Sequence, residues 1–318
     1  MSVASLLPNR GEPIEVALVN NMPDQAVDAT FAQFSGLLRA EAQDLPHRLR
    51  CYTFPSTPRS ETGRRALAQT HEPIGALYAR GADVLIVTGA EPRAPKLDGE
   101  PYWQEFAELV DWARANTYGA LWSCLAAHGA VLRLDGIRRR RESAKISGVF
   151  VCETADDWAT QGAARAILVP HSRYNGLPRA DLESRGYHIA SFSPEIGVDS
   201  FWRREPSLFL FTQGHPEYDP DTLAREFRRD VLRFLTGESA DFPPTPANYF
   251  SPDAYIGVED LKANADTTRR ARFAERLNAL LEHEAPQAHW RADAARLYRN
   301  FLAAVALGKA ARSRRLAL

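Results

Sequence analysis

Short apolar runs alternate with helical patterns along much of the chain, and this alternation is the strongest constraint on its fold. A strand buried on both faces reads as a continuous apolar run, and right-handed crossovers connect such strands in parallel. We therefore predict an α/β fold, a parallel sheet with helices on both faces. The predicted strands are Ile14–Val19, Arg48–Thr53, Val84–Thr88, Ala120–Ser123, Gly148–Cys152, Ala166–Val169, Ile189–Ser193 and Leu208–Thr212, and the predicted helices include Ala29–Ala40, Glu105–Ala115 and Asp221–Leu235.

The sequence changes character after Gly237. A proline-rich stretch at 243–246 indicates a linker, and the remainder from Val258 is helical in pattern and rich in Ala, Arg and Leu. We predict that residues 1–240 form the α/β domain and that residues 241–318 form the linker and a C-terminal helical extension packed on it. A chain of 318 residues with 45% hydrophobic content can bury one large core with such an extension.

Charge and cysteine usage exclude several classes of protein. The formal net charge is -1, so no global field favours nucleic acid or membrane partners. No apolar stretch approaches the length of a bilayer-spanning helix, and residues 1–5 lack the basic start and apolar core of an export signal. Cys51, Cys124 and Cys152 show no CxxC spacing, which favours a reducing compartment and no metal site. We expect a cytoplasmic protein.

Cys124 lies at the junction between a predicted strand and a helical pattern. The strand Ala120–Ser123 ends directly before it, and the small residues Ala126, Ala127, Gly129 and Ala130 follow. At such a turn the helix N-terminus favours the thiolate, and the backbone N–H of Leu125 can donate to an oxyanion. Considered alone, Cys124 is equally well interpreted as a small buried core residue.

A second segment supplies partners for a nucleophile. His215 and Glu217 follow the predicted strand Leu208–Thr212 and lie two residues apart, so in an extended backbone their side chains point to one face. Pro216 between them removes a ladder donor. Alone, this segment could be a surface loop with a chance acidic neighbour. Together with Cys124 it predicts a Cys-His-Glu triad and acyl-enzyme chemistry, at strand ends where open α/β sheets bind ligands.

Stretches along most of the chain match one family in order. They are Val16–Pro23, Leu85–Ala90 with Tyr102 and Trp103, the Cys124 turn, Lys145–Phe150, Pro170–Tyr174, Gly214–Asp219, Arg229 with Asp230, Asn248–Phe250, Trp290 with Arg291, and Asn300–Leu302. In these stretches the chain resembles the homoserine O-succinyltransferase (homoserine transsuccinylase) family. The resemblance implies the flavodoxin-like, doubly wound and mostly parallel sheet of class I glutamine amidotransferases.

The resemblance also implies the reaction. Cys124 is expected to accept an acyl group from an acyl-CoA, with succinyl-CoA favoured, and to pass it to L-homoserine in methionine biosynthesis. His215 is expected to be the general base and Glu217 its orienting partner. Backbone N–H groups of Leu125, and of Ala90 and Glu91, are expected to stabilise the oxyanion. No bound cofactor and no metal are expected, and the protein is expected to be a homodimer.

Three further residues fall on positions that bind substrate in that family. They are Lys145, Ser172 and Arg229, and a guanidinium suits the carboxylate of homoserine because it can donate two parallel hydrogen bonds. Without the family, Arg229 would be interpreted as a solvated helix arginine, Ser172 as a turn or capping hydroxyl, and Lys145 as a surface lysine.

The chain departs from the family pattern at several places. Asp24 and Gln25 follow Met22-Pro23, where lysine is usual, and the stretch 55–59 lacks the usual sequence. Leu125 replaces a common tryptophan and His128 a common glutamine. These departures allow a different acyl donor or acceptor, although the triad is intact.

Arg93 is the candidate determinant of the acyl donor. An ungapped count back from Trp103 places it at the family position where glycine accompanies succinyl transfer and glutamate acetyl transfer. A cation there would attract the free carboxylate of succinyl-CoA, so Arg93 favours a succinyl donor.

Other functions stay open at this point. Acetyl transfer, or an acceptor such as serine, would use the same site. An amidase or hydrolase like the glutamine amidotransferases would share the triad, but its turn normally carries glycines beside the cysteine, whereas Ser123 and Leu125–Ala127 surround Cys124. A non-catalytic relative is the third alternative.

Overall fold

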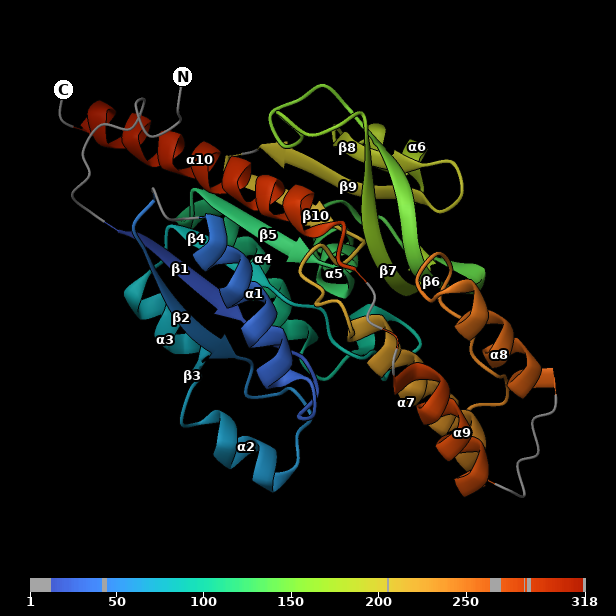
Figure 1. Cartoon of the computed structure of the whole chain (residues 1–318). Coiled ribbons are helices and arrows are strands. Elements are labelled where there is room, and N and C mark those ends of the chain that lie inside the picture. Colours follow the sequence, from blue (N-terminus) through green and yellow to red (C-terminus); the bar gives the residue numbers. More distant parts are fainter. Residues whose placement is uncertain are drawn as a thin grey trace.

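The computed structural model describes residues 13–41, 45–204, 206–263, 270–282, 284 and 287–316. Its centre is one mixed sheet with the strand order β3-β2-β1-β4-β5-β10-β9-β8-β6-β7 (Figure 1). The strands are β1 Ile14–Val19, β2 His47–Thr53, β3 Glu72–Pro73, β4 Val84–Val87, β5 Gly119–Ser123, β6 Arg140–Thr154, β7 Ala166–Gly176, β8 His188–Ser193, β9 Gly197–Arg204 and β10 Leu208–Thr212. From β3 to β10 all neighbours are parallel, and from β10 to β7 all are antiparallel.

Helices cover both faces of the parallel part. They are α1 Val27–Glu41, α2 Glu61–Leu67, α3 Ile74–Arg80, α4 Trp103–Asn116, α5 Leu125–Asp135, α6 Arg179–Glu183, α7 Thr222–Thr236, α8 Pro252–Ala263, α9 Arg270–Glu282 and α10 Arg291–Leu316, with a 3-10 turn at Leu97–Gly99. On one face α3, α4 and α5 bury a core that includes Val87, Phe106 and Trp122. On the other, α1 and α10 bury a core that includes Leu18 and Tyr298 (Figure 1).

The α/β fold predicted from the alternating pattern is confirmed. Strands β1 and β10 have the predicted bounds, and the order β2-β1-β4-β5-β10 is that of a flavodoxin-like doubly wound sheet. Among the helices of the described ranges, none has the length and apolarity that crossing a membrane requires. The prediction that the chain has no export signal concerns residues 1–5, which lie outside the described residues.

The predicted orientation of three strands is wrong. The runs within β6, β7 and β8 are antiparallel, and β6 and β7 are much longer than predicted. Parallel neighbours need a crossover of a dozen or more residues, usually with a helix. The connection between β6 and β7 contains no helix, and this suits an antiparallel pair. Strand β9 was not predicted, because its polar residues Asp199, Arg203 and Arg204 interrupt the apolar run.

The C-terminal segment packs against the rest of the chain through two main sets of apolar contacts. Helices α8 and α9 pack on α7 through a separate apolar cluster. Helix α10 returns to the sheet, where a Cβ on Gly119 of β5 would come 2.6 Å from Cγ2 of Val305. Because α10 shares the second face of the sheet with α1, residues 1–240 alone would leave the part of that face under α10 exposed.

We propose that the α/β part and α10 unfold as one unit. Replacing the buried Phe301 with alanine should then destabilise the whole chain by about 3–5 kcal/mol, because it opens a cavity between α10 and the sheet. Urea unfolding followed by tryptophan fluorescence and by circular dichroism should give one coincident transition at lower urea. Leu307→Ala, at an exposed position of the same helix, is the control and should change the midpoint little. Two separate transitions would contradict the proposal.

Candidate active site

Cys124 lies on a strained turn between β5 and α5. Its backbone has φ 51° and ψ -111°, and within the described residues the one other non-glycine residue with positive φ is Asn248. A bulky L-residue adopts this conformation only when its surroundings hold it there. The Cys124 N–H donates to the carbonyl of Thr212 at the end of β10 (2.7 Å), and α5 starts directly after the turn. The predicted strand-to-helix turn is therefore confirmed.

The loop after β4 lies against this turn. A Cβ on Gly89 would come 3.3 Å from the Leu125 nitrogen, so glycine permits the close approach. Beside the turn is a mainly apolar cavity whose lining includes Asn21, Ala90, Trp103, Phe106 and Leu125. Leu125 provides the first backbone N–H of α5, and Ala90 faces the same cavity. This arrangement is compatible with the predicted oxyanion donors.

His215 and Glu217 meet Cys124 at the same edge of the sheet. His215 Nδ1 lies 2.8 Å from Glu217 Oε1, and Cys124 lies near enough for its charge to raise the pKa of the imidazole. The imidazole stacks on the Tyr218 ring, with centroids 4.2 Å apart. Ser123 Oγ donates to the same Glu217 oxygen (3.3 Å), which fixes the buried carboxylate. The three residues are thus connected in the order that a nucleophilic triad requires.

The charges of the site stabilise the protonated form of His215. Burial would lower the pKa of this imidazole, but the negative charges of Cys124 and Glu217, and hydrogen bonds to both, raise it well above its usual value. The site therefore favours the imidazolium form of His215.

His128 links the helix that follows the nucleophile to the segment that carries His215. Its Nε2 lies 2.8 Å from the Gln213 Oε1, and burial lowers the pKa of His128 to about 3. A neutral His128 thus donates to Gln213, whose amide donates to the Val198 carbonyl (2.7 Å). Sequence reasoning noted His128 only as a departure and missed Gln213, because their contact joins residues far apart in the chain.

Lys145 and Arg229 meet at one carboxylate. Lys145 Nζ lies 2.6 Å from Asp230 Oδ2, and Arg229 Nε donates to Asp230 Oδ1 (2.9 Å). Burial would raise the pKa of Asp230, but the two cations outweigh it and lower that pKa, so Asp230 stays ionised. The Lys145 side chain is 6% exposed and Arg229 is 45% exposed, so Lys145 is no ordinary surface lysine. Asp230 was missed as a partner, because its contact with Lys145 joins residues 85 apart in the chain.

Ser172 lies on the strand beside Lys145. It pairs with Ser147 across β6 and β7, and Lys145 lies two residues before Ser147 on β6. Lys145 Nζ also lies 5.8 Å from the centre of the Tyr174 ring, two residues after Ser172. The predicted substrate-binding residues are therefore neighbours, while Ser172 is in a strand rather than a turn.

The remaining predicted residues lie on the loop after β4. The Glu91 carboxylate pairs with Arg233 of α7 (2.6 Å). Arg93 has an exposed side chain, and its backbone N–H donates to Glu100 Oε1 (2.8 Å), as does that of Ala94 (2.9 Å). Glu100 thus holds the loop, while Arg93 projects from it and does not line the cavity beside Leu125.

Two departures from the family pattern lie in contact. Asp24 Oδ1 lies 3.1 Å from Arg59 Nη1, and Asp24 Oδ2 accepts from the Ser60 hydroxyl (2.7 Å). Arg59 is buried and also donates to the carbonyls of Asn20 and Met22. The unusual stretch near Arg59 therefore carries the partner of the unusual Asp24.

Comparisons with known proteins identify close relatives. The profile of the family described as homoserine O-succinyltransferase matches residues 4–309. A protein of Rhodopseudomonas palustris named homoserine O-succinyltransferase is 45% identical over 294 residues, which are 92% of this chain and 88% of the relative. One of the same name from Bradyrhizobium japonicum is 46% identical over 273 residues, 85% of this chain and 84% of the relative.

Solved structures show weaker likeness. A glutamine amidotransferase from Thermotoga maritima is 12% identical with a TM-score of 0.49, over 93% of this chain and 99% of the other. A glutamine amidotransferase from Methylobacillus flagellatus is 15% identical with a TM-score of 0.46, over 86% and 95% of the two chains.

Glu217→Gln should lower the pKa of His215. The variant removes the charge that stabilises the imidazolium, so His215 should lose its proton at lower pH than in the wild type. The pKa of His215 is higher in the folded than in the unfolded state. Protonated His215 therefore contributes its full stability below the unfolded-state pKa, and this contribution is lost as pH rises through the folded-state pKa. NMR titration of His215 measures the shift. Asp219→Asn, which removes a partly exposed carboxylate paired with Arg291, is the control. An unchanged His215 titration in Glu217→Gln would contradict the role given to Glu217.

Proposed function

The chain belongs to the homoserine O-succinyltransferase family, and we propose that it transfers the succinyl group of succinyl-CoA to the hydroxyl of L-homoserine through a thioester on Cys124. It is an acyltransferase of methionine biosynthesis. The observation that carries the proposed mechanism is the connected line of Cys124, His215 and Glu217 on a strained turn at the end of the parallel strands.

In the first half-reaction, the Cys124 thiolate attacks the carbonyl carbon of the acyl-CoA thioester. A C–S bond to Cys124 forms, and the carbonyl oxygen becomes an oxyanion that the backbone N–H of Leu125 and those of Ala90 and Glu91 would stabilise. Collapse breaks the C–S bond to coenzyme A, whose sulfur takes the proton from His215. Because its pKa is raised, His215 carries that proton at the start of the cycle.

In the second half-reaction, neutral His215 removes the proton from the homoserine hydroxyl. The oxygen attacks the acyl-cysteine, and collapse breaks its C–S bond to release the ester and the Cys124 thiolate. His215 ends protonated and Glu217 holds its Nδ1–H throughout, so the starting state is restored.

Lys145, Ser172 and Arg229 would bind the amino-acid acceptor. Arg229 is partly exposed, so its guanidinium can reach the homoserine carboxylate, while buried Lys145 adds positive charge next to it. Asp230 holds both cations in place, and Glu226 Oε1 lies 3.9 Å from Arg229 Nη1.

Cys124 should form the acyl-enzyme. Intact-mass measurement after exposure to succinyl-CoA should show one added succinyl group, and L-homoserine should remove it, whereas Cys124→Ser should gain no thioester. Cys51→Ser is the control and should acylate normally, because burial raises the pKa of the Cys51 thiol to about 11 and keeps it protonated. An adduct on Cys51 or Cys152 would overturn the assignment. A glutamyl adduct after exposure to glutamine would instead indicate an amidase, and release by L-serine in preference would change the acceptor.

Arg93→Glu should shift the donor preference toward acetyl-CoA. The substitution replaces an attraction for the free succinyl carboxylate with a repulsion, and we expect the ratio of kcat/KM for succinyl-CoA to that for acetyl-CoA to fall by about ten-fold, or about 1.4 kcal/mol. Lys96→Glu makes the same charge change at another exposed position of the loop and should leave the ratio nearly constant. An unchanged ratio in Arg93→Glu would reject Arg93 as the determinant.

A further inference from the structure

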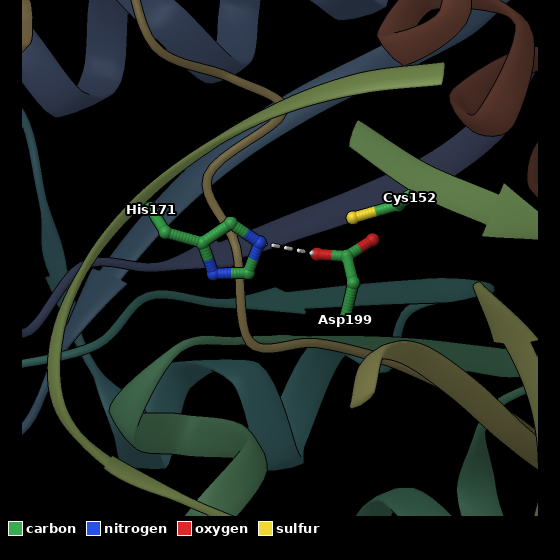
Figure 2. Close-up of side chains that lie close together, drawn as sticks. All are labelled: Cys152, His171 and Asp199. Atoms are coloured by element: carbon green, nitrogen blue, oxygen red, sulfur yellow. Dashed lines mark ion pairs between the residues drawn. The ribbon is translucent and has the colours of Figure 1, made fainter. Parts of the chain in front are cut away.

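A second group of reactive side chains lies buried beside the triad. Cys152 of β6, His171 of β7 and Asp199 of β9 point toward one another in the interior (Figure 2). His171 Nε2 lies 3.1 Å from Asp199 Oδ1, and neither side chain is more than 6% exposed. The proposed reaction gives none of these residues a role.

The donor set does not fit a metal ion, although the three ligand atoms lie within 4.8 Å of one another. Arg173 Nε points at His171 Nδ1 (3.4 Å), and a guanidinium can only donate, so Nδ1 must be the unprotonated acceptor. The ring proton then sits on Nε2 and faces Asp199, where a metal would have to bind. A metal-bound histidine instead donates its other ring N–H to an acceptor. Burial also strongly raises the pKa of the Cys152 thiol, which therefore stays protonated.

The pair is instead a neutral histidine whose Nε2 lies 3.1 Å from a carboxylate oxygen. Burial lowers the pKa of His171, so the ring carries no charge. Burial would raise the pKa of Asp199, but hydrogen bonds from His171 and Ser191 outweigh it and lower that pKa. Ser191 Oγ donates to Asp199 Oδ2 (2.6 Å), and Arg173 donates to the carbonyls of Asn175 and Ile196. Both members are thus held rigidly from several strands.

This rigid pair supports the backbone that carries His215. The N–H of Gln213 donates to the Asp199 carbonyl (2.7 Å), and that of Gly214 to the Asp199 carboxylate (3.2 Å). The N–H of His215 donates to the carbonyl of Pro170, which precedes His171 (2.8 Å). Three successive N–H groups therefore end on the pair or on its neighbour.

Gly214 shows how closely the backbone rests on the pair. A Cβ at this position would lie 2.5 Å from Asp199 Oδ1 and 2.8 Å from His171 Nε2. No other residue type would fit there without displacing one of them. The position of the His215 backbone is thus set by contact with the carboxylate and the imidazole.

We propose that Asp199 and His171 are positioning residues of the acyl transfer, which fix segment 213–215 so that the His215 imidazole contacts Cys124 and Glu217 at once. The inference rests on the proposed function of Cys124 and His215. A displacement of about 1 Å at a reacting group can cost on the order of 100-fold in rate, so loss of this support should be measurable in catalysis. Because His215 acts in both half-reactions, both should slow.

Asp199→Asn tests the inference with little change in shape. Acylation of Cys124 by succinyl-CoA and its release by L-homoserine should both slow by about 10- to 100-fold, with KM for each substrate nearly unchanged. Asp157→Asn is the matched control, because Asp157 accepts from a ring N–H (Trp202 Nε1, 2.8 Å) and from the backbone N–H of Ala159 (2.8 Å), neither of which belongs to segment 213–215. It should keep near wild-type rates.

A second pair of variants separates positioning from stability. His171→Gln keeps an N–H that can donate to Asp199, whereas His171→Leu removes it. We expect His171→Gln to retain most of the activity that His171→Leu loses, when the two variants have the same thermal stability. This pair decides the matter if Asp199→Asn does not fold. A wild type that forms no acyl-Cys124 would overturn the proposed function and this inference together. If the wild type forms the acyl-enzyme, two results would overturn this inference alone. One is that Asp199→Asn is no slower than Asp157→Asn. The other is that His171→Gln is no more active than His171→Leu.

Discussion

The parallel pairing of β5 with β10 is the constraint on which the site depends. Ser123 lies opposite Thr212 in this pair, so the two chains leave the sheet at the same level. The Cys124 N–H extends the pairing by one further bond to the Thr212 carbonyl, and this bond holds the strained turn. A shift of this register by one residue would move the nucleophile away from the segment that carries His215.

The parallel and antiparallel halves of the sheet supply different residues of the site. The parallel strands supply Cys124, the cavity beside it and the start of α5. Strands β6 and β7 supply Lys145 and Ser172, and β7 with β9 supplies the His171 and Asp199 pair beneath His215. Helix α7 then brings Arg229 and Asp230 to Lys145. The reacting groups and the groups that hold them therefore come from different layers of one fold.

Burial strengthens the interactions of the carboxylates in and around the site. Glu217, Asp199 and Asp230 are all nearly inaccessible to solvent, and each lies beside a cationic or hydrogen-bonding partner. Electrostatic interactions are stronger away from water, so each carboxylate fixes its partner with little freedom to rearrange. The C-terminal segment contributes to this closure, since the Trp290 indole donates to the carbonyl of Tyr218, the residue on which His215 stacks (3.0 Å).

Apolar runs and short motifs are enough to predict the α/β class, most strands and the triad candidates. Apolar runs such as Ile14–Val19 and Leu208–Thr212 are local signals, because a strand buried on both faces must be continuously apolar. The folded chain was needed to establish the antiparallel direction of β6, β7 and β8, the existence of β9, and the partners Gln213, His171, Asp199 and Asp230. These depend on pairings between distant segments, and a polar residue such as Asp199 reads as a loop residue until the folded chain buries it against a donor. Local periodicity records which face of an element is buried, but it does not record which element will cover that face.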